Sequence, residues 1–141
     1  MVIGFDFDGV LSGAPHFEPI VKMIAKSHRD YVVDNFFVLT TRDEVDREVQ
    51  ERLDELFGPI FVPAMAMGKF IDSGQYKTKA EYMVDSELIP DLFIDNDIVE
   101  IRSCYEHDIP CLMVPPMRKN EDAISYMLTT MFQSDFFKTY D

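Results

Sequence analysis

The sequence predicts an α/β protein of the Rossmann-like type, with a doubly wound parallel sheet of five strands and helices on both faces. The first observation behind this prediction is a series of short, continuously apolar runs, which are typical of strands buried on both faces. The second is that segments with apolar residues at helical spacing separate these runs, as in parallel sheets. The 141 residues suit a single domain over residues 1–141.

Five apolar runs are the expected strands, and residues 64–76, which show no clear period, are expected to form a loop. A helix should begin near Pro19, since proline suits a first helical position. Gly58 and Pro59 should end the second helix, as a left-handed cap followed by proline does. A helical extension is expected over the C-terminal residues 115–141. The strands are expected at 2–7, 36–40, 60–62, 92–95 and 110–114.

Three short patterns predict helix starts, because a threonine or aspartate followed three residues later by glutamate has the spacing of a capping box. They place the caps at Thr41, Thr78 and Asp97. The pattern at Thr41 is followed by apolar residues at helical spacing from Val45 to Phe57. Each of these helices is therefore expected to start directly after the preceding strand or loop.

The composition disfavours several classes of function. The chain carries 26 acidic and 13 basic residues, a net charge of −13, and this charge repels a nucleic acid backbone. No apolar run approaches the ~20 residues that span a bilayer. The N-terminal run lacks the basic flank and cleavage site of a signal peptide. We therefore expect a cytoplasmic protein without a membrane or nucleic acid partner, whose clustered carboxylates suit a divalent cation.

Polar side chains end three of the predicted strands. Asp6 and Asp8 end the first, Thr40 the second and Asp95 the fourth. Ligands of doubly wound sheets bind at the carboxyl ends of the strands, near the point where the strand order reverses. Asp6 and Asp8 would point the same way on an extended strand. Two carboxylates in one cleft repel each other, so a cation or a proton is expected between them.

These residue types suit phosphoryl transfer. A carboxylate held by Mg²⁺ can attack phosphorus, and a neighbouring carboxylic acid can protonate the leaving oxygen and later activate water. Asp95 would complete an oxygen site for Mg²⁺. The hydroxyl of Thr40 can donate to a phosphoryl oxygen. A lysine at a helix start, Lys77 or Lys79, can neutralise charge on the transferred group.

Residues 5–11, Phe-Asp-Phe-Asp-Gly-Val-Leu, resemble the first motif of the haloacid dehalogenase superfamily, most of whose members are phosphatases. The other motifs of that family have counterparts in the same order. They are a threonine after the second strand, Thr40, then a lysine before the last catalytic helix, and then an acid at the end of the fourth strand, Asp95. The resemblance covers residues 2–114.

The resemblance implies a role for each residue of the site. Asp6 would be the nucleophile and Asp8 the general acid and base. Mg²⁺ would bind the Asp6 and Asp95 carboxylates and the backbone carbonyl of Asp8. Lys79 is preferred to Lys77 as the motif lysine, because it stands at the first helical position. Thr40, Thr41, Lys77 and Lys79 are the candidates for substrate binding.

One position departs from the family pattern. Many relatives follow the fourth-strand acid with a second acid, whereas Asn96 stands here and Asp97 comes next. The outer part of the metal site therefore stays open, and Asp97 is either a metal ligand or a helix cap. His16, in the loop after the first strand, is a further residue that could line the site.

The intervals that hold cap domains in relatives are short here, so the resemblance implies a nearly capless phosphatase. Residues 64–76 are expected to border the site, and a second subunit docked through the C-terminal helix would give a homodimer. The expected substrate is a small phosphorylated molecule, a phosphomonoester, with a nucleotide as one candidate. The alternative is a non-catalytic binding or regulatory module that keeps the fold.

Overall fold

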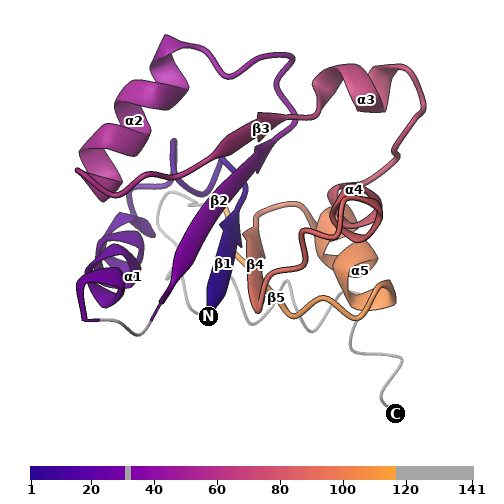
Figure 1. Cartoon of the computed structure of the whole chain (residues 1–141). Helices are drawn as coiled ribbons and strands as arrows, with labels where there is room; N and C mark the ends of the chain where they lie inside the picture. The colour runs from indigo at the N-terminus through magenta and orange to yellow at the C-terminus, as the bar shows by residue number, and fades with distance from the viewer. Residues whose placement is uncertain (31–32, 117–141) are drawn as a thin grey trace.

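Five parallel strands form the sheet of the computed structural model, which describes residues 1–30 and 33–116 (Figure 1). Their order is β3-β2-β1-β4-β5, and every neighbouring pair is parallel. The predicted doubly wound α/β class is therefore confirmed. The strands are β1 (Val2–Phe5), β2 (Asn35–Thr40), β3 (Ala64–Ala66), β4 (Leu92–Asp95) and β5 (Cys111–Met113).

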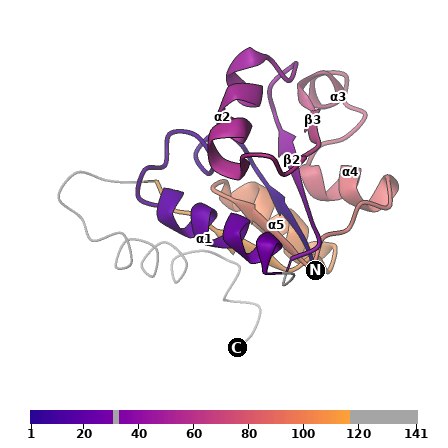
Figure 2. The same cartoon turned by 60° about the vertical axis from the view of Figure 1, so that its left-hand side comes forward.

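The helices lie on both faces of this sheet. Those on one face are α1 and α2, whereas α4 and α5 cover the other (Figures 1 and 2). The chain adds β2 and β3 on one side of β1, then β4 and β5 on the other, so the strand order reverses between β1 and β4. The helices are α1 (Glu18–Arg29), α2 (Arg47–Phe57), α3 (Gly68–Asp72), α4 (Lys79–Asp85) and α5 (Ile98–Glu106).

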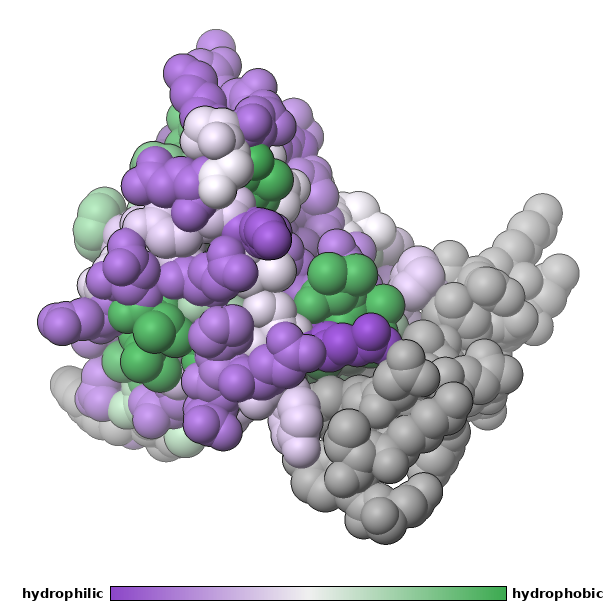
Figure 3. Space-filling view, turned by 90° about the vertical axis from the view of Figure 1, so that its right-hand side faces the viewer, coloured by the Kyte–Doolittle hydropathy of each residue, from purple (hydrophilic) through white to green (hydrophobic). Residues whose placement is uncertain are grey.

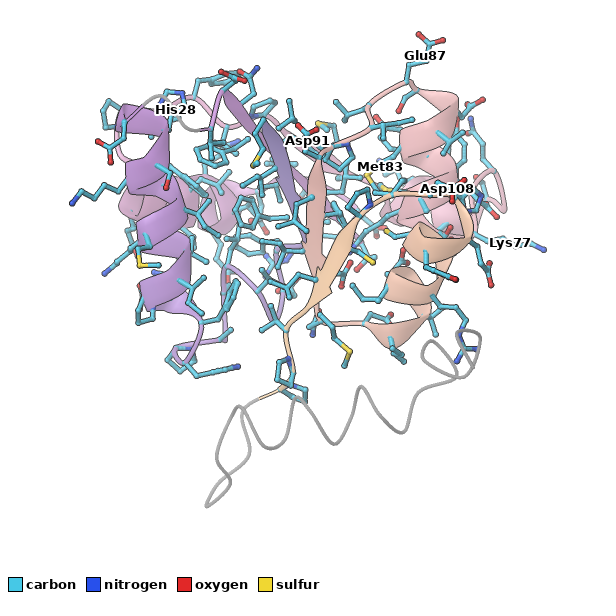
Figure 4. All side chains as sticks on the ribbon, turned by 90° about the horizontal axis from the view of Figure 1, so that it is seen from below. His28, Lys77, Met83, Glu87, Asp91 and Asp108 are labelled. Atoms are coloured by element: carbon cyan, nitrogen blue, oxygen red, sulfur yellow. The ribbon has the colours of Figure 1, made fainter. Side chains whose placement is uncertain are left out.

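Side chains pack against the sheet from both faces, as Figure 4 shows along its whole width. Met83 of α4 lies between that helix and the sheet and is fully buried (Figure 4). Gly4 of β1 has no room for a side chain, because a Cβ atom there would lie 2.5 Å from Phe37 and 2.8 Å from Phe93. The central strand can therefore carry large aromatic neighbours directly below the carboxyl ends of β1 and β4.

The third strand lies later in the chain than predicted. We expected residues 60–62, but β3 is Ala64–Ala66, and it pairs with Val38–Thr40 of β2. The Phe61 side chain is 85% exposed, and the first contact with β2 is the Pro63 carbonyl, which accepts from Val38 N. Residues 64–76 are accordingly not one loop, since they contain β3 and the short helix α3.

The second helix also begins later than predicted. Its cap is Asp46, whose carboxylate accepts a hydrogen bond from Val49 N at 3.1 Å. Thr41 does not cap it, because residues 41–46 form a loop whose backbone is bound elsewhere. Arg42 N donates to Thr40 Oγ1, and Gly68 N donates to the Arg42 carbonyl. These tertiary contacts override the local capping pattern.

The other two predicted caps are confirmed. Thr78 caps α4 by accepting from Glu81 N, and the Glu81 carboxylate in turn accepts from Lys77 N. Asp97 caps α5 by accepting from Val99 N. Both helices therefore start immediately beside the carboxyl edge of the sheet.

The surface of the described residues is mainly hydrophilic on the face that Figure 3 shows, with a few separate hydrophobic areas. Within the described residues, no helix combines the length and apolar character that crossing a bilayer demands. The predicted C-terminal helix falls almost wholly on residues 117–141. That prediction, and the homodimer that depends on it, lie outside the described residues.

The correction at α2 gives a test of stability. Asp46→Ala should lower the free energy of unfolding by about 1 kcal/mol, because the first turn of α2 loses its cap. Asp46→Asn keeps a capping oxygen and should cost only a few tenths. Urea unfolding monitored by circular dichroism measures both. If Thr41→Ala destabilises the protein more than Asp46→Ala does, the cap assigned here is wrong.

Candidate active site

The ammonium group of Lys79 joins the ends of two strands. Its Nζ lies 2.7 Å from Asp6 Oδ1 and 2.8 Å from Asp95 Oδ2. Asp6 follows β1, where its N–H continues the ladder to the Ile94 carbonyl, and Asp95 ends β4. All three side chains are buried. The structure therefore brings these three predicted residues together at the point where the strand order reverses.

Two residues of α5 hold the start of α4, and with it Lys79. The Glu100 carboxylate accepts from Lys79 N at 2.8 Å, and the Ser103 hydroxyl lies 2.7 Å from Thr78 Oγ1. Glu100 is itself buried, which raises its pKa, while the hydrogen bond from Lys79 N lowers it in part. A polar contact between helices thus fixes where the lysine side chain enters the site.

Burial and charge set the protonation of this cluster. Burial, reinforced by the charge of Asp95, raises the pKa of Asp6 from 3.8 to about 7, against the opposing effect of Lys79. Burial opposes the charge on Lys79, but the Asp95 and Asp6 carboxylates more than compensate and raise its pKa. In the absence of a further cation, Asp6 therefore binds a proton in the neutral range, because one ammonium does not balance the buried carboxyls.

Asn96 faces the second oxygen of Asp6. With its nitrogen turned inward, its amide lies 2.8 Å from Asp6 Oδ2, 3.1 Å from the Asp8 carbonyl and 3.3 Å from Asp95 Oδ1. The amide then donates to these oxygens. Gly9, with a φ of +83°, makes room for it, since a Cβ atom at that position would lie 2.6 Å from the amide carbon of Asn96.

Oxygens of Asp6, Asp8, Asp95 and Asn96 are the groups that could hold a small divalent cation. With the Asn96 amide turned the other way, its oxygen would meet the other three oxygens at 2.8 to 3.3 Å, a contact that either a cation or a proton on Asp6 would make favourable. Neighbouring oxygens around an octahedral Mg²⁺ with bonds of about 2.1 Å lie about 3.0 Å apart. The described residues contain no metal-binding group of three or more His, Cys, Asp or Glu, so this oxygen set draws on a carbonyl and an amide.

The Asp8 side chain does not have the position that the sequence predicts. The extended geometry that placed it beside Asp6 does not hold, because β1 ends at Phe5 and the chain turns at Gly9. The Asp8 side chain is 53% exposed and accepts two hydrogen bonds from Arg42, at 3.0 Å from Nε and 2.8 Å from Nη2. Arg42 thus engages both carboxylate oxygens of Asp8, while the backbone carbonyl of Asp8 lies beside the Asn96 amide.

Thr40 and the segment after it border the same edge. The fully buried Thr40 ends β2, and its Oγ1 accepts from Arg42 N at 3.2 Å. Met67 N donates to the Thr40 carbonyl, so the start of α3 lies against this strand end. Residues 66–68, in the segment predicted to border the site, therefore lie against the end of β2. Thr41 is exposed in the adjoining loop.

Three other predicted candidates lie outside the cluster. The Lys77 side chain is exposed and extends outward from the molecule in Figure 4. Asp97 caps α5 with its side chain, and its N–H donates to Asp95 Oδ1. The ring of His16 lies against the Pro115 carbonyl, at 2.8 Å from Nε2. The structure thus favours Lys79 over Lys77 for the position beside Asp6.

Sequence reasoning missed two residues that the structure places at the site. Arg42 stands within the capping pattern that begins at Thr41, and nothing local in the sequence predicts its pairing with Asp8. Glu100 was also read as a capping residue of α5. Burial of a charged residue on a helix face would have been its only signal. Asn96 was singled out as a departure from the family pattern, and its amide proves to face Asp6.

Comparisons with known proteins show the fold. Neither the protein-family models nor the curated proteins compared with this chain give a match. A crystal structure of an uncharacterized protein from Corynebacterium glutamicum aligns with a TM-score of 0.56 at 14% identity, over 94% of this chain and 96% of that one. The core domain of a "putative phosphoglycolate phosphatase" from Streptococcus pneumoniae aligns with a TM-score of 0.46 at 9% identity, over 95% and 96%.

The raised pKa of Asp6 predicts a pH dependence of stability. The folded protein binds this proton more tightly than the unfolded chain does, so the free energy of unfolding should fall as pH rises from about 4 to about 7. Above that range the effect should be constant. Asp6→Asn removes the titrating group. Its melting temperature in chelator, relative to that of wild type, should therefore increase as pH rises across this interval. A constant difference between the two proteins would contradict the assigned shift.

The ion pairs of Lys79 predict a large difference between two lysines. Lys79→Met leaves two buried carboxyls without their cation and should cost about 3–5 kcal/mol of stability. Lys77→Met changes an exposed side chain and should stay within about 0.5 kcal/mol. Urea unfolding of both variants in chelator gives the comparison. Equal, small effects would show that Lys79 is not buried between the two carboxyls.

Proposed function

We propose that this chain is a Mg²⁺-dependent phosphatase of the haloacid dehalogenase type, which hydrolyses a phosphomonoester through a phosphoryl group on Asp6. The observation that carries the proposal is the bridge from Lys79 to Asp6 and Asp95 at the switch point of the sheet. It unites residues that are distant in sequence, in the order of the family's motifs. Lys79 binds only Oδ1 of Asp6, so Oδ2 of Asp6 faces the Asn96 amide.

Charge balance supports a cation at this place. Asp6, Asp95 and Glu100 are three buried carboxyls, and Lys79 is the buried ammonium among them. A divalent cation offsets this excess of negative charge better than a proton on Asp6 does, and it leaves Asp6 ionised. Mg²⁺ would be held by the Asp6 and Asp95 carboxylates and the Asp8 carbonyl, with the Asn96 amide beside them, and would neutralise charge on the transferred phosphoryl group.

The residues of the chain then have distinct tasks. A carboxylate oxygen of Asp6 forms a bond to phosphorus as the bond from phosphorus to the leaving oxygen breaks, and Asp8 gives that oxygen its proton. Water next attacks the phosphorus of the aspartyl-phosphate and passes a proton back to Asp8, which frees phosphate and restores Asp6. Lys79 neutralises part of the negative charge on the transferred phosphoryl group, and Thr40 provides a hydroxyl donor at the end of β2.

One contact favours a second candidate, a binding or regulatory module without turnover. Both carboxylate oxygens of Asp8 are engaged by Arg42, so Asp8 has to leave this pair before it serves a leaving group. A module that only binds phosphorylated ligands would not need that step. Turnover of any phosphomonoester separates the two candidates, because a binding module has none.

The proposal predicts metal-dependent hydrolysis of a generic aryl phosphate. Wild-type protein should release phosphate in Mg²⁺, lose this activity in excess chelator and recover it on addition of Mg²⁺. Asp6→Asn should remove essentially all turnover with the fold intact, which circular dichroism checks. Lys77→Ala is the matched control and should retain most of the rate. Full activity in chelator, or near wild-type rates from well-folded Asp6→Asn, would rule out this mechanism.

A further inference from the structure

We propose that Arg42 selects substrates that carry a second anionic group, a carboxylate or a phosphate, beside the phosphoryl group that Asp6 attacks. This inference rests on the function proposed above, since Arg42 pairs with Asp8, the proposed general acid and base. It would make Arg42 a specificity residue and would narrow the substrate class to phosphomonoesters with at least one additional negative group. Three features of the structure support it.

The first feature is that backbone hydrogen bonds and the Phe7 ring fix the position of Arg42. The backbone of Arg42 is tied to Thr40 Oγ1 through its N–H, and to Gly68 N through its carbonyl. Gly68 packs so closely that a Cβ atom there would lie 2.7 Å from the Thr41 carbonyl oxygen. The guanidinium carbon lies 5.0 Å from the centre of the Phe7 ring, the neighbour of Asp6. The charge of Arg42 is thereby fixed beside Phe7 and Asp8, the two residues that follow the proposed nucleophile in the chain.

The second feature is that its present partners are exchangeable. Nε and Nη2 bind Asp8, whereas Nη1 and Nη2 bind Glu48 at 3.2 and 3.5 Å. The Asp8 and Glu48 side chains are 53% and 67% exposed, against 25% for Arg42. Ion pairs with such exposed carboxylates contribute little. A carboxylate or phosphate on a substrate presents the same pair of oxygens and can replace either of them.

The third feature is the negative charge around Arg42. Three acidic side chains form ion pairs with Arg42, and the whole chain has a net charge of −13. A second anion would be repelled here unless a cation received it, and the hydrogen bonds to Asp8 and Glu48 keep the pKa of Arg42 high and its charge permanent. The three paired acids are Asp8, Asp46 and Glu48.

An exchange of this kind would also affect the rate. When a substrate anion takes the Nε and Nη2 edge of Arg42, the carboxylate of Asp8 loses both hydrogen bonds and is released toward the reacting group. Binding of the second anion and release of the general acid and base are then one event. The second anionic group should therefore raise kcat as well as lower KM, whereas a merely attractive charge would lower KM alone.

The test compares matched substrates that differ by one anionic group. One pair is glycerol 3-phosphate and 3-phosphoglycerate, which adds a carboxylate; the other is a nucleoside 5′-monophosphate and the 3′,5′-bisphosphate, which adds a phosphate. With Mg²⁺, wild type should favour one or both of the doubly anionic compounds in kcat/KM by roughly ten- to a hundredfold. The pair that shows the preference identifies the anion as carboxylate or phosphate.

Three variants locate the preference. Arg42→Gln should reduce the ratio within the preferred pair to about one. Glu48→Gln removes a competing carboxylate from an exposed position and should increase the ratio. Arg47→Gln changes a 91% exposed arginine of α2, the helix that also carries Glu48. This arginine pairs with Glu51, and its replacement should leave the ratio and the basal rate unchanged.

The outcomes separate this inference from the proposed function. Hydrolysis with equal rates within both pairs, or a preference that survives in Arg42→Gln, overturns the role of Arg42 and leaves the phosphatase standing. Absence of any hydrolysis contradicts the phosphatase instead. Calorimetric binding of the four compounds to wild type and Arg42→Gln then decides the inference without turnover. Tighter binding of a doubly anionic compound that is lost in Arg42→Gln supports it, and equal binding overturns it.

Discussion

The buried contact of Lys79 with Asp6 and Asp95 is the interaction on which the rest of the site depends. It connects the ends of two parallel strands to the first turn of α4, and Glu100 of α5 holds that turn from behind. Without the ammonium, the two carboxyls would face each other across the switch point in a medium that penalises charge. The position of α4 and the ionisation of Asp6 are therefore set by the same contact.

This arrangement is strained electrostatically rather than sterically. One ammonium serves several buried carboxyls, and the raised pKa of Asp6 is the physical expression of that shortage. Asn96 relieves part of it by donating to the free oxygen of Asp6. The same amide presents an oxygen when it is reversed. This shortage of positive charge, and the oxygens gathered around Asp6, are the reasons for which a divalent cation is proposed here.

The elements that sequence reasoning placed well are those whose signals are local. The apolar runs of β1, β2 and β4 predicted strands buried on both faces. The fold class then predicted that the polar residues at the ends of these strands lie at one edge of the sheet. The caps at Thr78 and Asp97 are formed by neighbouring residues, so their patterns were sufficient. Lys79 followed from the cap at Thr78, because a cap fixes which residue comes first in the helix.

The elements that were misplaced are decided by contacts across the chain. The start of α2 depends on the packing of the 41–46 loop against Gly68, and β3 is located only by its pairing with β2. Asp8 left the expected direction because the chain turns at Gly9, to a position where Arg42 meets its carboxylate. Such pairings join residues more than twenty positions apart, for which a single sequence carries no local signal.

The most direct test of the account is the chemical identity of the group that Asp6 carries during turnover. The Asp8→Asn protein is incubated with a phosphomonoester and Mg²⁺, then reduced with borohydride, which converts an aspartyl-phosphate into homoserine that mass spectrometry locates in the sequence. The account predicts homoserine at position 6, dependent on both substrate and Mg²⁺. Modification at another residue, or none in a preparation whose wild-type counterpart turns over the same substrate, would contradict it.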